Sequence, residues 1–167
     1  HIGKQKVREA LIKKLARRNR CAVLYQNLVG GQDELVFDGG SVLVNSQGKI
    51  TAKSESFSED FLLASLPENG NTEFIAPPLD KHTEIYRALC LGTKDYIQKN
   101  GFKKVLIGLS GGIDSALVAV LAADALGKEN VIGVTMPSRY TSGETKSDAI
   151  LLAENLGIEC LEFSIEP

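Results

Sequence analysis

The sequence predicts an α/β protein whose carboxyl-terminal half is built on a doubly wound parallel sheet. From residue 80 onward, helix-like and strand-like segments alternate, and each strand-like run is short and rich in Val, Ile and Leu. Strands that alternate with helices favour parallel pairing through right-handed crossovers. The expected elements are helices at 80–99, 113–126 and 141–156 and strands at 104–109, 131–136 and 158–163.

The first of these helices has a signal at each end. Asp80 is a suitable N-cap, because its carboxylate accepts hydrogen bonds from the free N–H groups of a first helical turn. Asn100-Gly101 ends the helix, since glycine adopts the left-handed conformation of a C-cap at little cost. The residues expected to face the core are Ile85, Leu89 and Tyr96.

The two later helices are also delimited by local signals. Thr141 and Glu144 have the spacing of a capping box, and Leu156-Gly157 closes the helix that follows. In the helix expected at 113–126, which Gly127 ends, residues 116–123 are apolar on every side. Both of its sides therefore need cover. We expect its outer side to meet another subunit or a missing segment, which favours a homo-oligomer.

The amino-terminal segment predicts a basic amphipathic helix. Residues 1–20 contain eight bases and one acid. Val7, Leu11 and Leu15, with Ala10 on the adjoining row, recur at helical spacing, so we expect this row to face the core and the bases to face solvent.

Short strands are expected after this helix. Cys21–Tyr25 is an apolar run typical of a buried strand. Leu35–Phe37 and Val42–Val44 flank Asp-Gly-Gly-Ser, which predicts a hairpin. A turn at 46–48 precedes a strand at Lys49–Lys53. The polar, proline-containing stretch that follows is expected to be a linker that partly orders on a neighbour.

Composition excludes several classes of protein. A net charge of −2 with 43% hydrophobic residues does not fit a disordered chain, and the near-neutral balance argues against a general nucleic-acid binder. No apolar run is long enough to span a membrane. Three scattered cysteines without a CxxC motif suit a reducing compartment, which favours the cytoplasm. The opening His1 is no initiator, so we expect a cut from a longer polypeptide.

The strongest chemical signal is the loop between the strand at 104–109 and the next helix. It reads Ser-Gly-Gly-Ile-Asp-Ser over residues 110–115. Glycines allow the backbone to approach an anion, and a helix N-terminus provides free N–H groups with a partial positive charge. Asp114 would repel a phosphate unless a cation lies between them, and Mg²⁺ is the natural choice. The loop thus predicts a phosphate site with magnesium at Asp114.

Two features limit this interpretation. The loop lacks the Gly-Lys-Ser/Thr of a Walker A motif, so it is poorly suited to holding a transferring γ-phosphate with a loop lysine. A plain strand-to-helix turn, with Asp114 as an ordinary first-turn acid, is the alternative.

The same loop carries a family resemblance. SGGIDSA at 110–116 resembles the pyrophosphatase loop of amide-forming ligases that activate substrates by adenylylation, GMP and asparagine synthetases among them. MPSRYTS at 136–142, Asp148-Ala149 and the pattern from Leu152 to Ile158 resemble NAD synthetases more closely. The amino-terminal half is similar to the end of a nitrilase-type glutaminase domain, on the segments HIGK at 1–4, NLVGGQDE at 27–34 and FDGGS at 37–41.

Together these motifs resemble the domain junction of glutamine-dependent NAD synthetases. The resemblance implies the end of a nitrilase-like α-β-β-α sandwich at 1–56, a linker at 57–80, and the first part of an ATP-pyrophosphatase-type domain at 81–167. It implies conversion of deamido-NAD, ATP and glutamine-derived ammonia to NAD, AMP and pyrophosphate through an adenylate.

The resemblance also implies roles for residues. Lys4 would contact glutamine, although a solvated first-turn lysine is the alternative. The family's glutaminase nucleophile precedes this region, so no catalytic residue is assigned, and Cys21, Cys90 and Cys160 are expected to be structural. The implied magnesium ligand is Asp114, and the implied ATP contacts are Gly108, Leu109, Ser110, Gly111, Gly112, Ile113, Asp114, Ser115, Met136 and Arg139.

Two other functions stay open at this point. The parent could be a different adenylylating amidotransferase, such as a GMP synthetase-like enzyme, which its nucleotide product would reveal. The chain could instead be a non-catalytic nucleotide-binding or assembly module. In the isolated chain, we expect neither half-reaction to occur.

Overall fold

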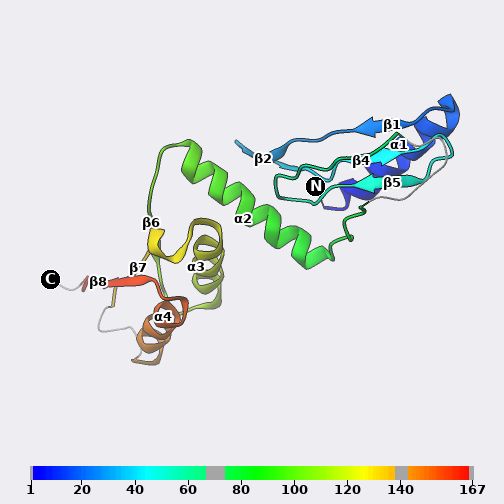
Figure 1. The fold of residues 1–167 in the computed structure, drawn as a ribbon. Coiled ribbons are helices and arrows are strands. Elements are labelled where there is room, and N and C mark those ends of the chain that lie inside the picture. The colour runs from blue at the N-terminus through cyan, green and yellow to red at the C-terminus, as the bar shows by residue number, and fades with distance from the viewer. Residues whose placement is uncertain (1, 67–73, 138–142, 166–167) are drawn as a thin grey trace. The chain divides into compact units, whose positions relative to one another are not determined.

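The computed structural model of the protein describes residues 2–66, 74–137 and 143–165, the side chains of 143–146 excepted. The chain forms two compact units, residues 1–91 and 92–167 (Figure 1). The helices are α1 (Lys4–Asn19), α2 (Lys81–Lys99), α3 (Ile113–Leu126) and α4 (Gly143–Leu156), with a short 3-10 turn η1 (Lys128–Asn130). The strands are β1 (Val23–Tyr25), β2 (Val29–Gln32), β3 (Leu35–Asp38), β4 (Val42–Val44), β5 (Ile50–Lys53), β6 (Val105–Gly108), β7 (Val131–Thr135) and β8 (Glu159–Glu162).

The first unit is organised around an antiparallel sheet with the strand order β1-β4-β5. Its central strand β4 is buried along its whole length. Helix α1 packs on one face of this sheet, where Ile12 and Ala16 meet Val42 and Val44. The predicted turn at 46–48 and the strand after it are confirmed, because the Asn45 side chain accepts the backbone N–H groups of Gln47 and Lys49.

The face of α1 that packs is not the predicted one. Val7, Leu11 and Leu15 are 61%, 63% and 50% exposed, whereas Ile12 and Ala16 are buried. The helix carries two apolar rows, and the row with the small Ala16 lies against the sheet. The bases on α1 accordingly share the outer surface with an apolar stripe.

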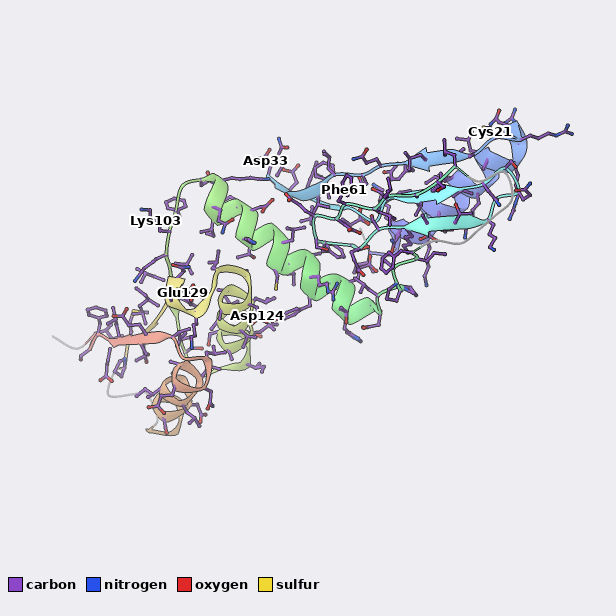
Figure 2. The ribbon with its side chains drawn as sticks, in the orientation of Figure 1. Cys21, Asp33, Phe61, Lys103, Asp124 and Glu129 are labelled. Carbon is purple, nitrogen blue, oxygen red and sulfur yellow. The ribbon has the colours of Figure 1, made fainter. Side chains whose placement is uncertain are left out.

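The predicted hairpin across Asp-Gly-Gly-Ser is also wrong. β3 pairs with β2 across a turn at Asp33-Glu34, and β4 belongs to the other sheet. Gly39 and Gly40 both have positive φ angles, 63° and 62°, so two successive left-handed residues redirect the chain from one sheet to the next. Figure 2 shows Asp33 at the tip of the β2–β3 hairpin.

Strand β1 is less buried than the sequence predicts. It forms the edge of its sheet, and Leu24 is 68% exposed because it points away from α1. Cys21 precedes the strand and is exposed, beside the end of α1 in Figure 2. The expectation of a buried strand over 21–25 is therefore wrong.

The stretch predicted as a linker contacts the first sheet beside Lys53. Ile75 forms an isolated bridge with Lys53, and Ala76 donates its N–H to the Lys53 carbonyl at 3.0 Å. Ala76 is only 2% exposed. This agrees with a linker that orders partly on a neighbour, while the boundaries 57 and 80 stay predictions.

The predicted cap of α2 is confirmed. Asp80 Oδ1 accepts the backbone N–H groups of His82 at 2.9 Å and Thr83 at 3.1 Å, and the Thr83 hydroxyl donates to Asp80 Oδ2. Gly101, with φ 78°, follows the helix end as expected. The inward row was wrong, however, because no described residue of α2 is buried and Leu89 and Tyr96 are 48% and 59% exposed.

The hydrogen bonds of this cap favour the charged form of the Asp80 carboxylate. The pKa of Asp80 is lowered from its usual 3.8, first by the Thr83 hydroxyl and then by the backbone N–H groups. Because the pKa is lower in the folded state, the cap stabilises the protein fully at pH values above the unfolded-state pKa. This stabilisation is lost as the pH falls through the folded-state pKa. We expect an NMR titration of the Asp80 carboxylate to give a midpoint below 3.8 and Thr83→Ala to raise it. A midpoint at or above the usual value would contradict the cap.

The second unit confirms the α/β prediction. Strands β6, β7 and β8 form a sheet in that order, and both pairs are parallel. Alanines of α3 and α4 pack on it with Leu109, Val131 and Ile158. The predicted capping box lies outside the described residues at Thr141, and the predicted end of α4 is confirmed.

The other face of this sheet is less covered than predicted. Leu106 is 70% exposed, so β6 is not the doubly buried strand that its composition indicates.

Helix α3 is buried on one side only. Its Ala119, Ala122 and Ala125 are buried, while Leu117 and Val118 are about half exposed, at 53% and 52%. In the described part of the chain, every helix is too short or too polar to cross a lipid bilayer.

Candidate functional site

The predicted phosphate loop lies where strand β6 ends and helix α3 begins. Leu109, the first loop residue, donates its N–H to the Val134 carbonyl at 2.7 Å, which ties the loop to β7. Its side chain is 3% exposed and lies against Gly133, where an added Cβ would come within 2.6 Å of Leu109 Cδ1. The departure of the loop from the sheet is therefore fixed by backbone and core contacts.

The two loop serines brace the turn from inside. The Ser115 hydroxyl donates to the Gly112 carbonyl at 2.9 Å and accepts the Ser110 N–H at 3.2 Å. The Ser110 hydroxyl accepts the Gly112 N–H at 3.3 Å and lies 3.1 Å from the Ser115 hydroxyl. Gly111 has φ 76°, which an L side chain rarely adopts. These contacts give the loop a defined curvature.

The loop presents the N-terminus of α3 to solvent. Gly112, Ile113 and Asp114 are exposed, Ile113 by 82%. The first N–H groups of a helix have no intrahelical acceptor, so those of α3 are available to an anion. Asp114 is the acid of the first turn. The predicted residues of the loop are therefore brought together on one exposed edge of the sheet.

The loop has one acidic side chain, Asp114, that could hold magnesium. Among the residues that the structure describes, no three His, Cys, Asp or Glu side chains gather as a ligand set. Mg²⁺ commonly uses one or two carboxylates and completes its shell with phosphate oxygens and waters. The single exposed carboxylate of Asp114 beside the glycine loop fits this mode of binding. The described residues do not fit a site in which all magnesium ligands come from the protein.

The neighbouring strand adds one further predicted residue. Met136 directly follows β7 and is 53% exposed, and its Cε would lie 3.9 Å from a Cβ placed on Gly108. The ends of β6 and β7 thus bring Met136 beside Gly108, as parallel pairing requires. Arg139 lies outside the described residues.

Lys4, the predicted glutamine contact, belongs to the first unit. It is the first residue of α1 and lines a cavity of about 230 Å³ together with Glu34, Asp38, Phe57 and Glu84. The preceding residue, Gly3, donates its N–H to Glu84 Oε1 at 3.1 Å. Lys4 is exposed, and it shares the wall of this cavity with the acidic side chains of Glu34, Asp38 and Glu84. Its contact with glutamine stays a prediction.

One cluster near this cavity was missed by sequence reasoning. Arg8 Nη2 donates to both carboxylate oxygens of Asp38, at 2.8 and 2.7 Å, and the Asn27 side-chain amide donates to Asp38 Oδ1 at 2.8 Å. Arg8 also lies over the Tyr25 ring, 5.4 Å from its centroid. The sequence alone indicates no more than a turn at Asp38. Its position directly before two glycines is the one local signal that could have singled it out.

The Cys160 thiol lacks the surroundings of an activated nucleophile. Burial, with a smaller effect from Glu162, raises the pKa of the Cys160 thiol above its usual 9.0. A nucleophilic thiolate needs the opposite shift. The expectation that this thiol is structural agrees with its surroundings.

A parallel β-α-β unit with a glycine loop before a helix N-terminus is typical of phosphate-binding α/β proteins. Residues 85–167 belong to the NAD synthase family, whose model they match. Curated glutamine-dependent NAD(+) synthetases are similar over nearly the whole chain: that of Synechocystis is 47% identical over 99% of this chain and 30% of its own length, and that of Aquifex aeolicus is 44% identical over 95% and 34%.

Solved structures of glutamine-dependent NAD+ synthetases are also similar to this chain. The glutamine-dependent NAD+ synthetase from Acinetobacter baumannii, in complex with ADP, superposes with a TM-score of 0.92 at 38% identity, over 99% of this chain and 32% of that one. The synthetase from Cytophaga hutchinsonii shares the fold, with a TM-score of 0.86 at 22% identity. The chain thus spans about a third of the length of the relatives that it matches.

Proposed function

We propose that this chain is part of a glutamine-dependent NAD synthetase. The complete enzyme would convert deamido-NAD, ATP and ammonia from glutamine to NAD, AMP and pyrophosphate through an adenylate. The observation that carries this proposal is the braced glycine loop at the end of β6, in a chain 47% identical to such an enzyme along 99% of its length. Residues 1–56 would end the glutaminase domain, 57–80 would link, and 81–167 would begin the synthetase domain.

The loop would bind the β- and γ-phosphates of ATP. Free N–H groups at the start of α3 would donate hydrogen bonds to the leaving pyrophosphate and stabilise the negative charge that develops on it. An electrostatic site of this kind needs no reorganisation during the reaction. The contacts would come from Gly108 to Ser115. Met136 would lie near the adenosine, as would Arg139. Support for the nucleotide comes from the ADP complex of the Acinetobacter baumannii relative.

Asp114 would hold the magnesium ion. A bound Mg²⁺ supplies positive charge that offsets the repulsion between this carboxylate and the phosphates. The protein's part is to keep Asp114 on the first turn of α3, where the brace between Ser110 and Ser115 fixes the loop. Lys4 would contact glutamine in the first unit, where it lines the cavity described above.

A direct assay tests the proposal. The complete protein that contains this chain, given deamido-NAD, ATP, Mg²⁺ and glutamine, is expected to form NAD, AMP and pyrophosphate in equal amounts. Ammonium chloride should replace glutamine. No NAD from either nitrogen source would reject the proposal. Amidation of a different nucleotide supplied in place of deamido-NAD would favour another adenylylating amidotransferase.

A further inference from the structure

The amino terminus of α1 lacks the groups that normally stabilise a helix start. Its N-cap is Gly3, with φ 74° and no side-chain cap, and its first turn contains no acid. Lys4 and Lys6 lie in that turn instead, where positive charge opposes the helix dipole. In a capping box, a carboxylate three residues after the N-cap would accept the N-cap N–H, and here that position is Lys6.

A residue distant in sequence provides the missing carboxylate. Glu84 Oε1 accepts the Gly3 N–H at 3.1 Å, although the two residues are separated by 81 positions. Glu84 is itself the acid of the first turn of α2. Its negative charge therefore lies at the start of two helices, and both dipoles favour it.

The hydrogen bond acts on the residue just before Lys4. Gly3 is conformationally permissive, and nothing lies within 4 Å of the place where a Cβ would be, so packing does not fix its backbone. Glu84 and Lys4 also line the same cavity. Because the Gly3 backbone determines where α1 begins, the Glu84 carboxylate fixes the point from which the Lys4 side chain extends.

We propose that Glu84 is a positioning residue for the glutamine site: it holds the Gly3-Lys4 turn by accepting the Gly3 N–H, and so keeps Lys4 in place. This inference rests on the proposed function, because it takes Lys4 as a glutamine contact. Glu84 itself needs no contact with glutamine.

The test is the kinetics of Glu84→Ala in the complete protein. Glutamine hydrolysis by this variant is expected to show a KM raised about tenfold with kcat changed less than about twofold, because a misplaced contact weakens binding before it affects chemistry. NAD formation from saturating ammonium chloride should equal that of the wild type. Glu84→Gln keeps an oxygen acceptor for the Gly3 N–H and should restore most of the KM.

Matched controls and outcomes separate this role from a structural one. Glu59→Ala removes an exposed acid of the same unit that does not line the cavity, and it should leave KM unchanged. An unchanged KM in Glu84→Ala, or an equal loss of ammonia-driven synthesis, would overturn the inference while the proposed function stands. A wild-type protein that makes NAD from neither glutamine nor ammonia would overturn both.

Discussion

Asp114→Asn in the complete protein is expected to lower NAD formation by about 100- to 1000-fold, while glutamine hydrolysis stays within about twofold of the wild type. Asparagine has the same shape and can still occupy the first turn of α3, but it brings no negative charge to a cation. The cation would then lose its protein ligand, and the loss should appear with glutamine and with ammonium chloride alike.

The measurement needs two assays and one control. NAD and pyrophosphate report the synthetase reaction, and glutamate reports glutamine hydrolysis. Asp124→Asn changes an exposed carboxylate further along the same helix and should leave both rates unchanged. If Asp114→Asn retained synthesis at any Mg²⁺ concentration, the interpretation of the loop as a metal-assisted phosphate site would be wrong. An equal fall in glutamine hydrolysis would indicate damage to the fold instead.

The features predicted correctly depend on neighbours in sequence. The bounds of α3, the parallel pairing of β6, β7 and β8 and the Asp80 cap follow from glycine positions, short apolar runs and capping chemistry. The loop 110–115 was found for the same reason, because all its parts are contiguous. Its internal brace was not foreseen, since two hydroxyls five residues apart meet only when the turn takes its observed curvature.

The errors arose where distant segments decide the outcome. Helix α1 has two apolar rows, and spacing alone does not say which one meets β4. Asp-Gly-Gly predicts a hairpin, yet β3 pairs with β2 because Asp33 turns with a positive φ of 50°. The contacts of Arg8 with Asp38 and of Gly3 with Glu84 join segments whose proximity no local pattern contains.

A buried ion pair between α1 and β5 in the first unit predicts a large loss of stability when one of its partners is removed. Lys53 Nζ lies 2.9 Å from Glu9 Oε1, and the two side chains are only 8% and 19% exposed. Removing one partner of such a pair leaves a buried charge without compensation, which typically costs about 3 kcal/mol. Glu9→Ala is therefore expected to destabilise the contact between α1 and β5 by about that amount, because Lys53 cannot reach solvent easily from the sheet.

Hydrogen exchange in the complete protein measures this without requiring two-state unfolding. Amides of α1, β4 and β5 should exchange about 100-fold faster in Glu9→Ala, which corresponds to roughly 3 kcal/mol. Lys13→Ala removes only the longer contact of 3.9 Å to Glu9 Oε2 and should change exchange little. The double variant Glu9→Ala, Lys53→Met removes both charges and should recover most of the protection. If the double variant exchanged as fast as Glu9→Ala, the cost would come from lost packing of Glu9 and not from the stranded ammonium.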